Sequence, residues 1–383
     1  MEVQLPLRGE TRFNPPVGYL EKSNADSPGE PRSICILRLS SIGDVIHTLP
    51  VADLIRKKYP CARITWVAEK TMAPLLRNHP SVDHLLLVDS RSWRRRILTP
   101  AVWKEILSFL RYLRAQQFDI ALDFQGLFKS AVLARVSGAA RRIGMSRADR
   151  KETWSSIFLN ELSQKTINKK HIIEKNLALL ESIGISAENE PLNFHIYAEE
   201  ESTQYVENEL QKFELHDFVL INPGGGWITK LWSVDKFAQL IDLMYNDLHM
   251  PALIVWGPGE KHIADKIARK CISPAFVSFS TNLAELIALI RKSRLMVSGD
   301  TGPLHLASAI GVPVVGIYGP TDPTRNGPWN PQDSACTVHY ECSPCYQRTC
   351  PIGVQCLKKL DVGPVLDAVK KTFYLSSSLN QNH

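Results

Sequence analysis

Long apolar runs are missing from this chain of 383 residues, although 44% of its residues are hydrophobic. No run reaches the roughly 18 apolar residues that a membrane-spanning helix needs, and residues 1–31 lack the apolar core of a signal peptide. We therefore expect a cytoplasmic protein. Residues 1–31 are rich in Pro, Gly, Glu and Asn and show no periodicity, which predicts a flexible N-terminal tail.

Cysteine is scarce, with eight residues in the whole chain. Without an export signal, these cysteines indicate reduced thiols or metal ligands rather than disulfides. Four of them lie close together near the end of the sequence: Cys342, Cys345, Cys350 and Cys356. They are enough for a structural zinc, but their spacing does not match a standard zinc ribbon. Reduced thiols are the favoured interpretation, and zinc is the alternative.

The excess of positive over negative charge is also small, with a net charge of +6 for the whole chain. This value fits an anionic substrate or a membrane surface and does not by itself indicate nucleic acid. Two basic clusters stand out, one formed by Arg94, Arg95 and Arg96 and one around Lys151. Arginine binds carboxylates and phosphates through two parallel hydrogen bonds, although such a run is more often only a solvated loop.

The length of the chain predicts two domains, because a domain has about 150 residues. Short apolar runs alternate with helical patterns from residue 33, and a second such series begins at residue 218. This alternation is typical of parallel sheets covered by helices. We expect Rossmann-like domains at residues 32–200 and 215–358 and a last helix at 359–375. The expected strands are residues 34–37, 64–67, 85–88, 120–123, 192–197, 218–222, 253–256, 275–277, 295–298 and 314–317, and the expected helices of the first half are 45–58 and 101–116.

Ligands of open parallel sheets bind at the carboxyl ends of the strands, so the loops at those ends are the candidate sites. In the first domain, Ser41, Gly43 and Asp44 follow the first strand, and Gln125 follows a later one. Small residues let a ligand approach the backbone. Asp44 is either a general base or only a helix N-cap, which is the commoner role at such a junction. Gln125 either reaches a ligand or provides ordinary loop polarity.

In the second domain, a glycine-rich loop containing Gly225 and Gly226 precedes Lys230. Exposed N–H groups and a cation suit phosphate oxygens, and a flexible turn with a solvated lysine is the alternative. The loop is neither a P-loop nor a dinucleotide fingerprint, which disfavours nucleotide hydrolysis. Glu260 follows another strand, where it either holds the hydroxyls of a ribose or is solvated.

The most informative segment is residues 298–309, where a strand ends and a helix of small residues begins. The N-terminus of that helix would offer free N–H groups and a positive dipole end to a diphosphate. The candidate residues at this helix start are Asp300, Thr301, Gly302, Pro303, Leu304 and His305. Capping by the first two and a structural role for the histidine are the alternatives.

Taken together, four separated segments closely resemble the ADP-heptose lipopolysaccharide heptosyltransferases of glycosyltransferase family 9, heptosyltransferase I in particular. The segments are residues 39–50 (LSSIGDVIHTLP), 123–126 (DFQG), 230–232 (KLW) and 299–305 (GDTGPLH). The resemblance spans nearly all of residues 33–360. Several motifs in the right order are more specific than any one of them, so the functional interpretation outweighs each local alternative.

The resemblance implies the GT-B fold, in which two Rossmann-like domains face each other across a cleft and the last helix crosses back to the first domain. It implies transfer of heptose from ADP-heptose to Kdo-lipid A with inversion and without a metal or cofactor. Asp44 would be the general base, and Lys230 would stabilise the departing ADP. Thr301 and Gly302 would bind the diphosphate, Asp300 the heptose and Glu260 the ribose.

For the acceptor, the resemblance implies contacts from Arg94, Arg95 and Arg96. The other residues that we expect to bind the acceptor are Ser41, Gly43, Gln125 and Lys151. The same cluster would hold a monomeric enzyme on the anionic inner face of the cytoplasmic membrane. No nucleic-acid partner is expected, because basic residues interleaved with aromatics do not extend beyond Trp93 and its arginines. Two alternatives stay open: a family member with another acceptor or donor, such as heptosyltransferase II, and a non-catalytic nucleotide-sugar-binding protein. The presence of Asp44 and Lys230 speaks against the second.

Overall fold

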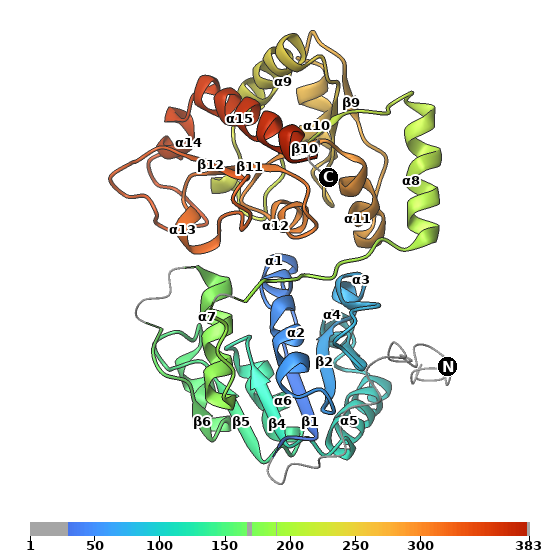
Figure 1. Ribbon diagram of the computed structural model, residues 1–383, viewed down its shortest axis with the longest axis vertical. Helices are drawn as coiled ribbons and strands as arrows, with labels where there is room; N and C mark the ends of the chain where they lie inside the picture. Colours follow the sequence, from blue (N-terminus) through green and yellow to red (C-terminus); the bar gives the residue numbers. More distant parts are fainter. Residues whose placement is uncertain (1–29, 167–170, 189, 381–383) are drawn as a thin grey trace. The chain divides into compact units, whose positions relative to one another are not determined.

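The computed structural model describes residues 30–166, 171–188 and 190–380 and consists of two compact units (Figure 1). The N-terminal unit is Met1–Tyr197, and the C-terminal unit is Ala198–His383. Among these described residues, each unit contains one six-stranded parallel sheet, so the prediction of two Rossmann-like α/β domains is confirmed. The expected tail, residues 1–31, lies outside the described residues except for its last two.

In the N-terminal unit the strands are arranged in the order β3-β2-β1-β4-β5-β6. The central strand β1 (Ser33–Leu37) is buried along its whole length and pairs with β2 and β4, which explains why it is almost continuously apolar. The other strands are β2 (Arg63–Glu69), β3 (His84–Val88), β4 (Ile120–Asp123), β5 (Arg141–Gly144) and β6 (Glu161–Leu162). The helices are α1 (Ile42–Ile46), α2 (Leu49–Lys58), α3 (Ala73–Leu76), α4 (Ser90–Arg95), α5 (Pro100–Ala115), α6 (Phe128–Val136) and α7 (Ile172–Leu179), with 3₁₀ turns η1 (Lys70–Met72), η2 (Thr153–Phe158) and η3 (Leu180–Ile183).

In the C-terminal unit the strand order is β12-β11-β10-β7-β8-β9, which repeats the order of the N-terminal unit when the strands are counted from β7. The strands are β7 (Val219–Asn222), β8 (Ala252–Ile254), β9 (Ala275–Val277), β10 (Leu295–Gly299), β11 (Val314–Tyr318) and β12 (Ser334–Thr337). The helices are α8 (Glu200–Lys212), α9 (Val234–Leu248), α10 (Lys261–Ala268), α11 (Leu283–Lys292), α12 (Gly302–Ala309), α13 (Pro323–Asn326), α14 (Gln355–Lys359) and α15 (Val362–Asn380), with the 3₁₀ turn η4 (Ile228–Lys230).

The strand order reverses at one point in each sheet, between β1 and β4 and between β7 and β10. Loops that leave neighbouring strands at such a point diverge to opposite faces of the sheet and leave a crevice, where ligands of this fold bind. The topology therefore selects four loops, which follow β1, β4, β7 and β10. These loops contain most of the residues that the sequence singled out.

Several expected elements differ from those observed. Residues 192–197 belong to no strand, although Phe194 and Ile196 are buried. The helix expected at 45–58 is divided into α1 and α2, because Pro50 lies in the first turn of α2 and cannot continue a helix from the preceding turn. The polar segment between the expected domains forms α8, which packs on α11.

The last helix, α15, starts at Val362 and runs to Asn380, further than the expected 359–375. It packs on α9, β11 and β12, and all of these belong to the C-terminal unit (Figure 1). The expected return of this helix to the first domain stays a prediction. Among the described residues, none of the helices combines the length and the apolar character that crossing a bilayer demands.

Candidate functional site

Asp44 lies in the first turn of α1, just after the carboxyl end of β1. Its Oδ1 forms an ion pair with Nη2 of Arg38 at 2.8 Å. Its Oδ2 accepts hydrogen bonds from the backbone N–H and the hydroxyl of Ser41 at 3.3 and 3.2 Å. Nζ of Lys151 lies 3.9 Å from the same oxygen. The side chain of Asp44 is 25% exposed, so a ligand can reach it.

The charge state of Asp44 follows from these contacts. Burial raises the pKa of Asp44, but the charges of Arg38 and Lys151 and the N–H of Ser41 outweigh burial and lower the pKa to about 2. The carboxylate is therefore ionised at neutral pH and able to accept a proton. The N-cap interpretation is wrong, because Ser41 is the N-cap of α1 and Asp44 is its third helical residue. Ser41 is exposed, and Gly43 is buried inside α1.

Arg38 was missed by the sequence reasoning. It is 4% exposed, and its guanidinium donates to the carbonyl of Asp44 at 3.1 Å and to the carbonyl of Phe124. Arg38 thus ties the loop after β1 to the loop after β4. A charged residue directly after a buried strand was the available signal, because such a charge must find a partner within the fold.

Gln125 and Lys151 are positioned by a buried network. Oε1 of Gln125 accepts from the backbone N–H groups of Leu39 and Ser40 at 2.9 and 3.2 Å, which fixes the loop that carries Asp44. Asp123 and Arg150 form a fully buried ion pair at 2.7 Å, and Lys151 follows Arg150 directly. This anchor holds Lys151 beside Asp44, with its own side chain 62% exposed. Acceptor contacts by Gln125 and Lys151 stay predictions.

The three predicted arginines differ in their surroundings. Arg94 and Arg95 end α4, and both are exposed. Arg96 is held by two hydrogen bonds to Glu105 of α5, at 3.1 and 2.9 Å. Within the described residues, no ion pair engages Arg94 or Arg95. Helix α4 follows the carboxyl end of β3, so the cluster leaves the same edge of the sheet as the loop of Asp44.

In the C-terminal unit, Lys230 and Asp300 form an ion pair between the loops that follow β7 and β10. Nζ of Lys230 donates to Oδ2 of Asp300 at 2.6 Å and to its carbonyl at 3.0 Å. Nζ also lies 4.6 Å from the centre of the Trp227 ring, a favourable cation–π distance. The two charged side chains are only 15% and 3% exposed. An ammonium has three N–H donors, so one donor of Lys230 remains for a ligand.

The other oxygen of Asp300 is also occupied. Oδ1 accepts from Nδ2 of Asn326 at 2.8 Å and lies 3.2 Å from Nε2 of His305. Burial raises the pKa of Asp300, but His305 and Lys230 outweigh burial and hold the pKa well below its usual range. Asp300 therefore orients Lys230 and His305, and its expected contact with a sugar hydroxyl stays a prediction. Asn326 was missed, and no sequence pattern linked it to residue 300.

Helix α12 begins next to this pair. Thr301 is its N-cap residue, and Oγ1 of Thr301 accepts from Nδ2 of Asn222 at 3.0 Å. The first N–H groups of a helix have no partner inside it, and Pro303 has no N–H, so Gly302 and Leu304 carry the donors. The predicted diphosphate-binding residues are thus assembled at one helix start, and Leu304, whose side chain is buried, contributes only backbone.

Glu260 holds the glycine loop together. Oε1 accepts from the N–H of Gly225 at 3.0 Å, and Oε2 accepts from the N–H of Gly257 at 3.2 Å. A Cβ on Gly224 would collide with Oε2, so a larger residue there would push the carboxylate away from these N–H groups. Each carboxylate oxygen keeps a lone pair that can accept from a hydroxyl. The N–H of Gly225 is already used, whereas the space beside Gly226 is open.

The four C-terminal cysteines are thiols, and they range from exposed (Cys342) to buried (Cys356). In the part of the chain that the structure describes, no group of three or more His, Cys, Asp or Glu side chains is placed to hold a metal ion. The zinc alternative thus gains no support from Cys342, Cys345, Cys350 and Cys356. Hydrogen bonds from the backbone N–H groups of Val354 and Ile352 lower the pKa of Cys350.

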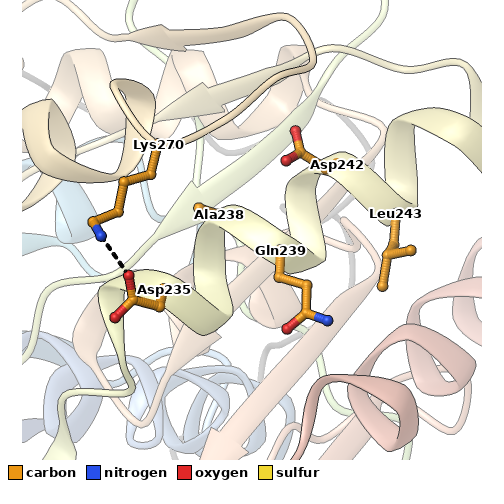
Figure 2. A pocket seen from close by; sticks show the side chains of 6 residues that line it. All are labelled: Asp235, Ala238, Gln239, Asp242, Leu243 and Lys270. Carbon is orange, nitrogen blue, oxygen red and sulfur yellow. Dashed lines mark ion pairs between the residues drawn. The ribbon is translucent and has the colours of Figure 1, made fainter.

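A shallow pocket of about 370 Å³ lies on α9 (Figure 2). None of the predicted site residues lines this pocket. Lys270 and Asp235 pair across it at 2.6 Å and are 54% and 73% exposed. Asp242 is engaged by the N–H groups of Ile272 and Ser273 at 2.9 and 2.8 Å. An exposed ion pair of this kind contributes little interaction energy, so we do not place the functional site here.

Comparisons with known proteins indicate the family to which the chain belongs. The profile of glycosyltransferase family 9 (heptosyltransferase) matches residues 106–355. The chain is 29% identical over 315 residues to the lipopolysaccharide core heptosyltransferase OpsX of Haemophilus influenzae, covering 81% of this chain and 86% of that protein. It is 28% identical over 327 residues to lipopolysaccharide heptosyltransferase 1 of Pseudomonas aeruginosa, covering 83% and 87%.

Among solved structures, the E. coli heptosyltransferase WaaC with ADP matches with a TM-score of 0.73 and 24% identity, over 89% of this chain and 99% of that one. This likeness confirms the expected GT-B fold. Because the family profile covers well over half of the chain, the protein belongs to glycosyltransferase family 9, the heptosyltransferases.

Proposed function

We propose that this protein transfers heptose from ADP-heptose to the Kdo-lipid A inner core of lipopolysaccharide, with inversion at the anomeric carbon. One observation supports the proposal above all. In a member of this family, the reversal point of each sheet holds a charged site, with the carboxylate of Asp44 in the N-terminal unit and the cation of Lys230 beside the start of α12 in the C-terminal unit. Related proteins are named as lipopolysaccharide heptosyltransferases, and WaaC was solved with ADP.

On the acceptor side, Asp44 takes the proton of the attacking hydroxyl while the oxygen of that hydroxyl bonds to the anomeric carbon. The pKa of about 2 makes Asp44 a weak base that is always ionised at neutral pH. The hydroxyl becomes strongly acidic only as the new bond forms, so the proton moves late in the attack. Arg38 and the N–H of Ser41 fix the carboxylate, which therefore needs no reorientation during the reaction.

On the donor side, the glycosidic bond breaks and its electron pair leaves with the diphosphate. Negative charge therefore grows on the phosphate oxygens in the transition state. The remaining N–H donor of Lys230 and the N–H groups of Gly302 and Leu304 are preorganised to stabilise that charge. With this stabilisation supplied by the chain, we propose that no metal or cofactor takes part. Full activity in excess EDTA is the expected result.

For the acceptor, Arg94 and Arg95 are the available arginines, since Glu105 already engages Arg96. Changing both Arg94 and Arg95 to Ala is expected to raise the KM of the acceptor more than the KM of the donor. Changing the exposed Lys57 and Lys58 of the same unit to Ala is the matched control and should alter neither. Equal effects of the arginine changes on both substrates would contradict the acceptor assignment.

A transfer assay tests the whole proposal by offering several nucleotide sugars against Kdo-lipid A and against heptosylated acceptors. ADP-heptose with Kdo-lipid A is the expected pair, and Asp44→Ala is expected to abolish transfer while ADP binding persists. Transfer only to heptosylated acceptors would assign a different step, such as that of heptosyltransferase II. Binding of ADP without transfer to any acceptor would instead indicate a non-catalytic binding protein.

A further inference from the structure

The turn between α4 and α5 presents apolar side chains to solvent. Leu98 at its tip is 94% exposed, and Ile97 is 39% exposed. Trp103 and Leu107, one helical turn apart on α5, are 51% and 48% exposed. Single exposed apolar residues are common on proteins, but four of them within eleven residues form a patch. We refer to Ile97, Leu98, Trp103 and Leu107 as the apolar turn.

The apolar turn is held rigidly. Nε1 of Trp103 donates to the carbonyl of Ile97 at 2.9 Å, and Thr99 donates to the carbonyl of Arg96 through its hydroxyl at 2.8 Å. The double hydrogen bond between Arg96 and Glu105 joins the two helices. The backbone of the turn and the ring of Trp103 are therefore already ordered, and a partner need not order them first.

The opposite face of α5 explains why these side chains are not simply part of the core. Val102 and Leu113 are fully buried, and Phe109 packs edge-to-face on Trp93 of α4 with ring centres 5.8 Å apart. Helix α5 thus already buries one apolar stripe inside its own unit. The exposed residues form a second stripe, which has no use within the fold.

The segment that contains the apolar turn is strongly basic. Residues 89–114 contain seven Arg and Lys against two acidic residues, a net charge of +5, while the whole chain carries +6. Arg91, Arg94, Arg95, Lys104 and Arg111 are all exposed, and none of them forms an ion pair with another described residue. Apolar side chains at the tip of a basic surface fit an anionic bilayer, because the side chains enter the acyl boundary while the cations meet lipid headgroups.

We propose that the apolar turn inserts into the surface of an anionic lipid bilayer and docks the N-terminal unit there. Trp103 is suited to the level of the lipid headgroups, because tryptophan rings are amphipathic. Its N–H already donates to the carbonyl of Ile97. Docking would bring Arg94 and Arg95 to the depth of the phosphate groups. The lipid interaction does not depend on which sugar or acceptor the enzyme uses.

Sedimentation with vesicles tests the proposal on the full chain. Wild-type protein is expected to bind vesicles of equal parts phosphatidylcholine and phosphatidylglycerol, and to bind phosphatidylcholine vesicles much less. Leu98→Glu is expected to lower the partition coefficient on the mixed vesicles by about tenfold, since it removes an inserted apolar group and adds a repelled charge. Ile272→Glu is the matched control, because Ile272 is 96% exposed in the C-terminal unit, and it should bind as wild type does.

The proposal is overturned if Leu98→Glu binds mixed vesicles as well as the wild type does, or if Ile272→Glu weakens binding equally. It is also overturned if the wild type ignores both vesicles and Leu98→Glu instead dissociates a dimer in light scattering, which would identify a second copy as the occupant. Transfer to a water-soluble, deacylated acceptor keeps the two proposals apart. Leu98→Glu is expected to leave that activity unchanged, and absence of transfer by the wild type would contradict the proposed function alone.

Discussion

Changing Asp44 to Asn removes one charge from the ion pair with Arg38, and we expect a loss of stability that depends on pH. The pKa of Asp44 falls from 3.8 to about 2 on folding, with burial opposing the shift and Arg38, Lys151 and Ser41 driving it. At 1.36 kcal/mol for each pH unit, the depressed pKa contributes about 2 kcal/mol to the folded N-terminal unit. For a unit of this size, that corresponds to a melting temperature lower by roughly 5 °C in the variant.

The sign of the pH dependence follows from the direction of the shift. A carboxyl group with a depressed pKa stabilises the fold above its unfolded pKa of 3.8, and that contribution disappears as the pH falls through about 2. Calorimetry of wild type and Asp44→Asn should therefore show a difference that is constant from neutral pH down to 3.8 and shrinks below it. Asp235→Asn is the control, because the pair of Asp235 with Lys270 is mostly exposed and should contribute at most about 0.5 kcal/mol.

Two outcomes would refute this reasoning. An equal loss of stability at neutral and at strongly acidic pH would show that the shape of the side chain matters and its charge does not. No loss at neutral pH would show that the interaction with Arg38 only balances the burial of Asp44.

Three further predictions concern the C-terminal unit. Lys230→Met should lower kcat by about 100-fold with a smaller effect on ADP affinity, because the negative charge that Lys230 stabilises grows in the transition state. Steady-state kinetics and calorimetric measurement of ADP binding test this prediction, and an effect on KM alone would contradict it. Glu260→Gln should weaken ADP binding about tenfold, because one of its two N–H partners loses its acceptor, and unchanged ADP affinity by calorimetry would count against the ribose assignment. Because the pKa of Cys350 is lowered, Cys350 should react with iodoacetamide at a lower pH than an ordinary thiol does. Peptide mass spectrometry should detect this labelling at low pH in the wild type and not in Cys350→Ser.

The sequence predicted the central strands of each sheet because buried parallel strands are almost continuously apolar. It missed three strands at or next to the sheet edges: β5, β6 and β12. Arg141 and Arg142 make up half of β5, and β6 has only two residues, so neither shows an apolar run. Strands of this kind are recognised by the neighbour with which they pair, and that pairing is a property of the assembled sheet.

The candidate site was predictable in outline for a similar reason. Loops at the carboxyl ends of strands can be read from the strand pattern, and these loops contain Asp44, Lys230 and Asp300. Their partners come from elsewhere in the chain: Asn326 reaches Asp300 from α13, and Arg150 determines where Lys151 lies. Residues 192–197 show the opposite error, because an apolar run need not pair as a strand.

The repeated strand order has an evolutionary consequence. Each unit closes its own core, and the boundary at Tyr197 falls in a segment that belongs to no sheet. Genetic recombination at that point would exchange a complete lobe and leave the hydrophobic interior of the other lobe intact. A lineage can therefore replace one unit while it inherits the other unit unchanged.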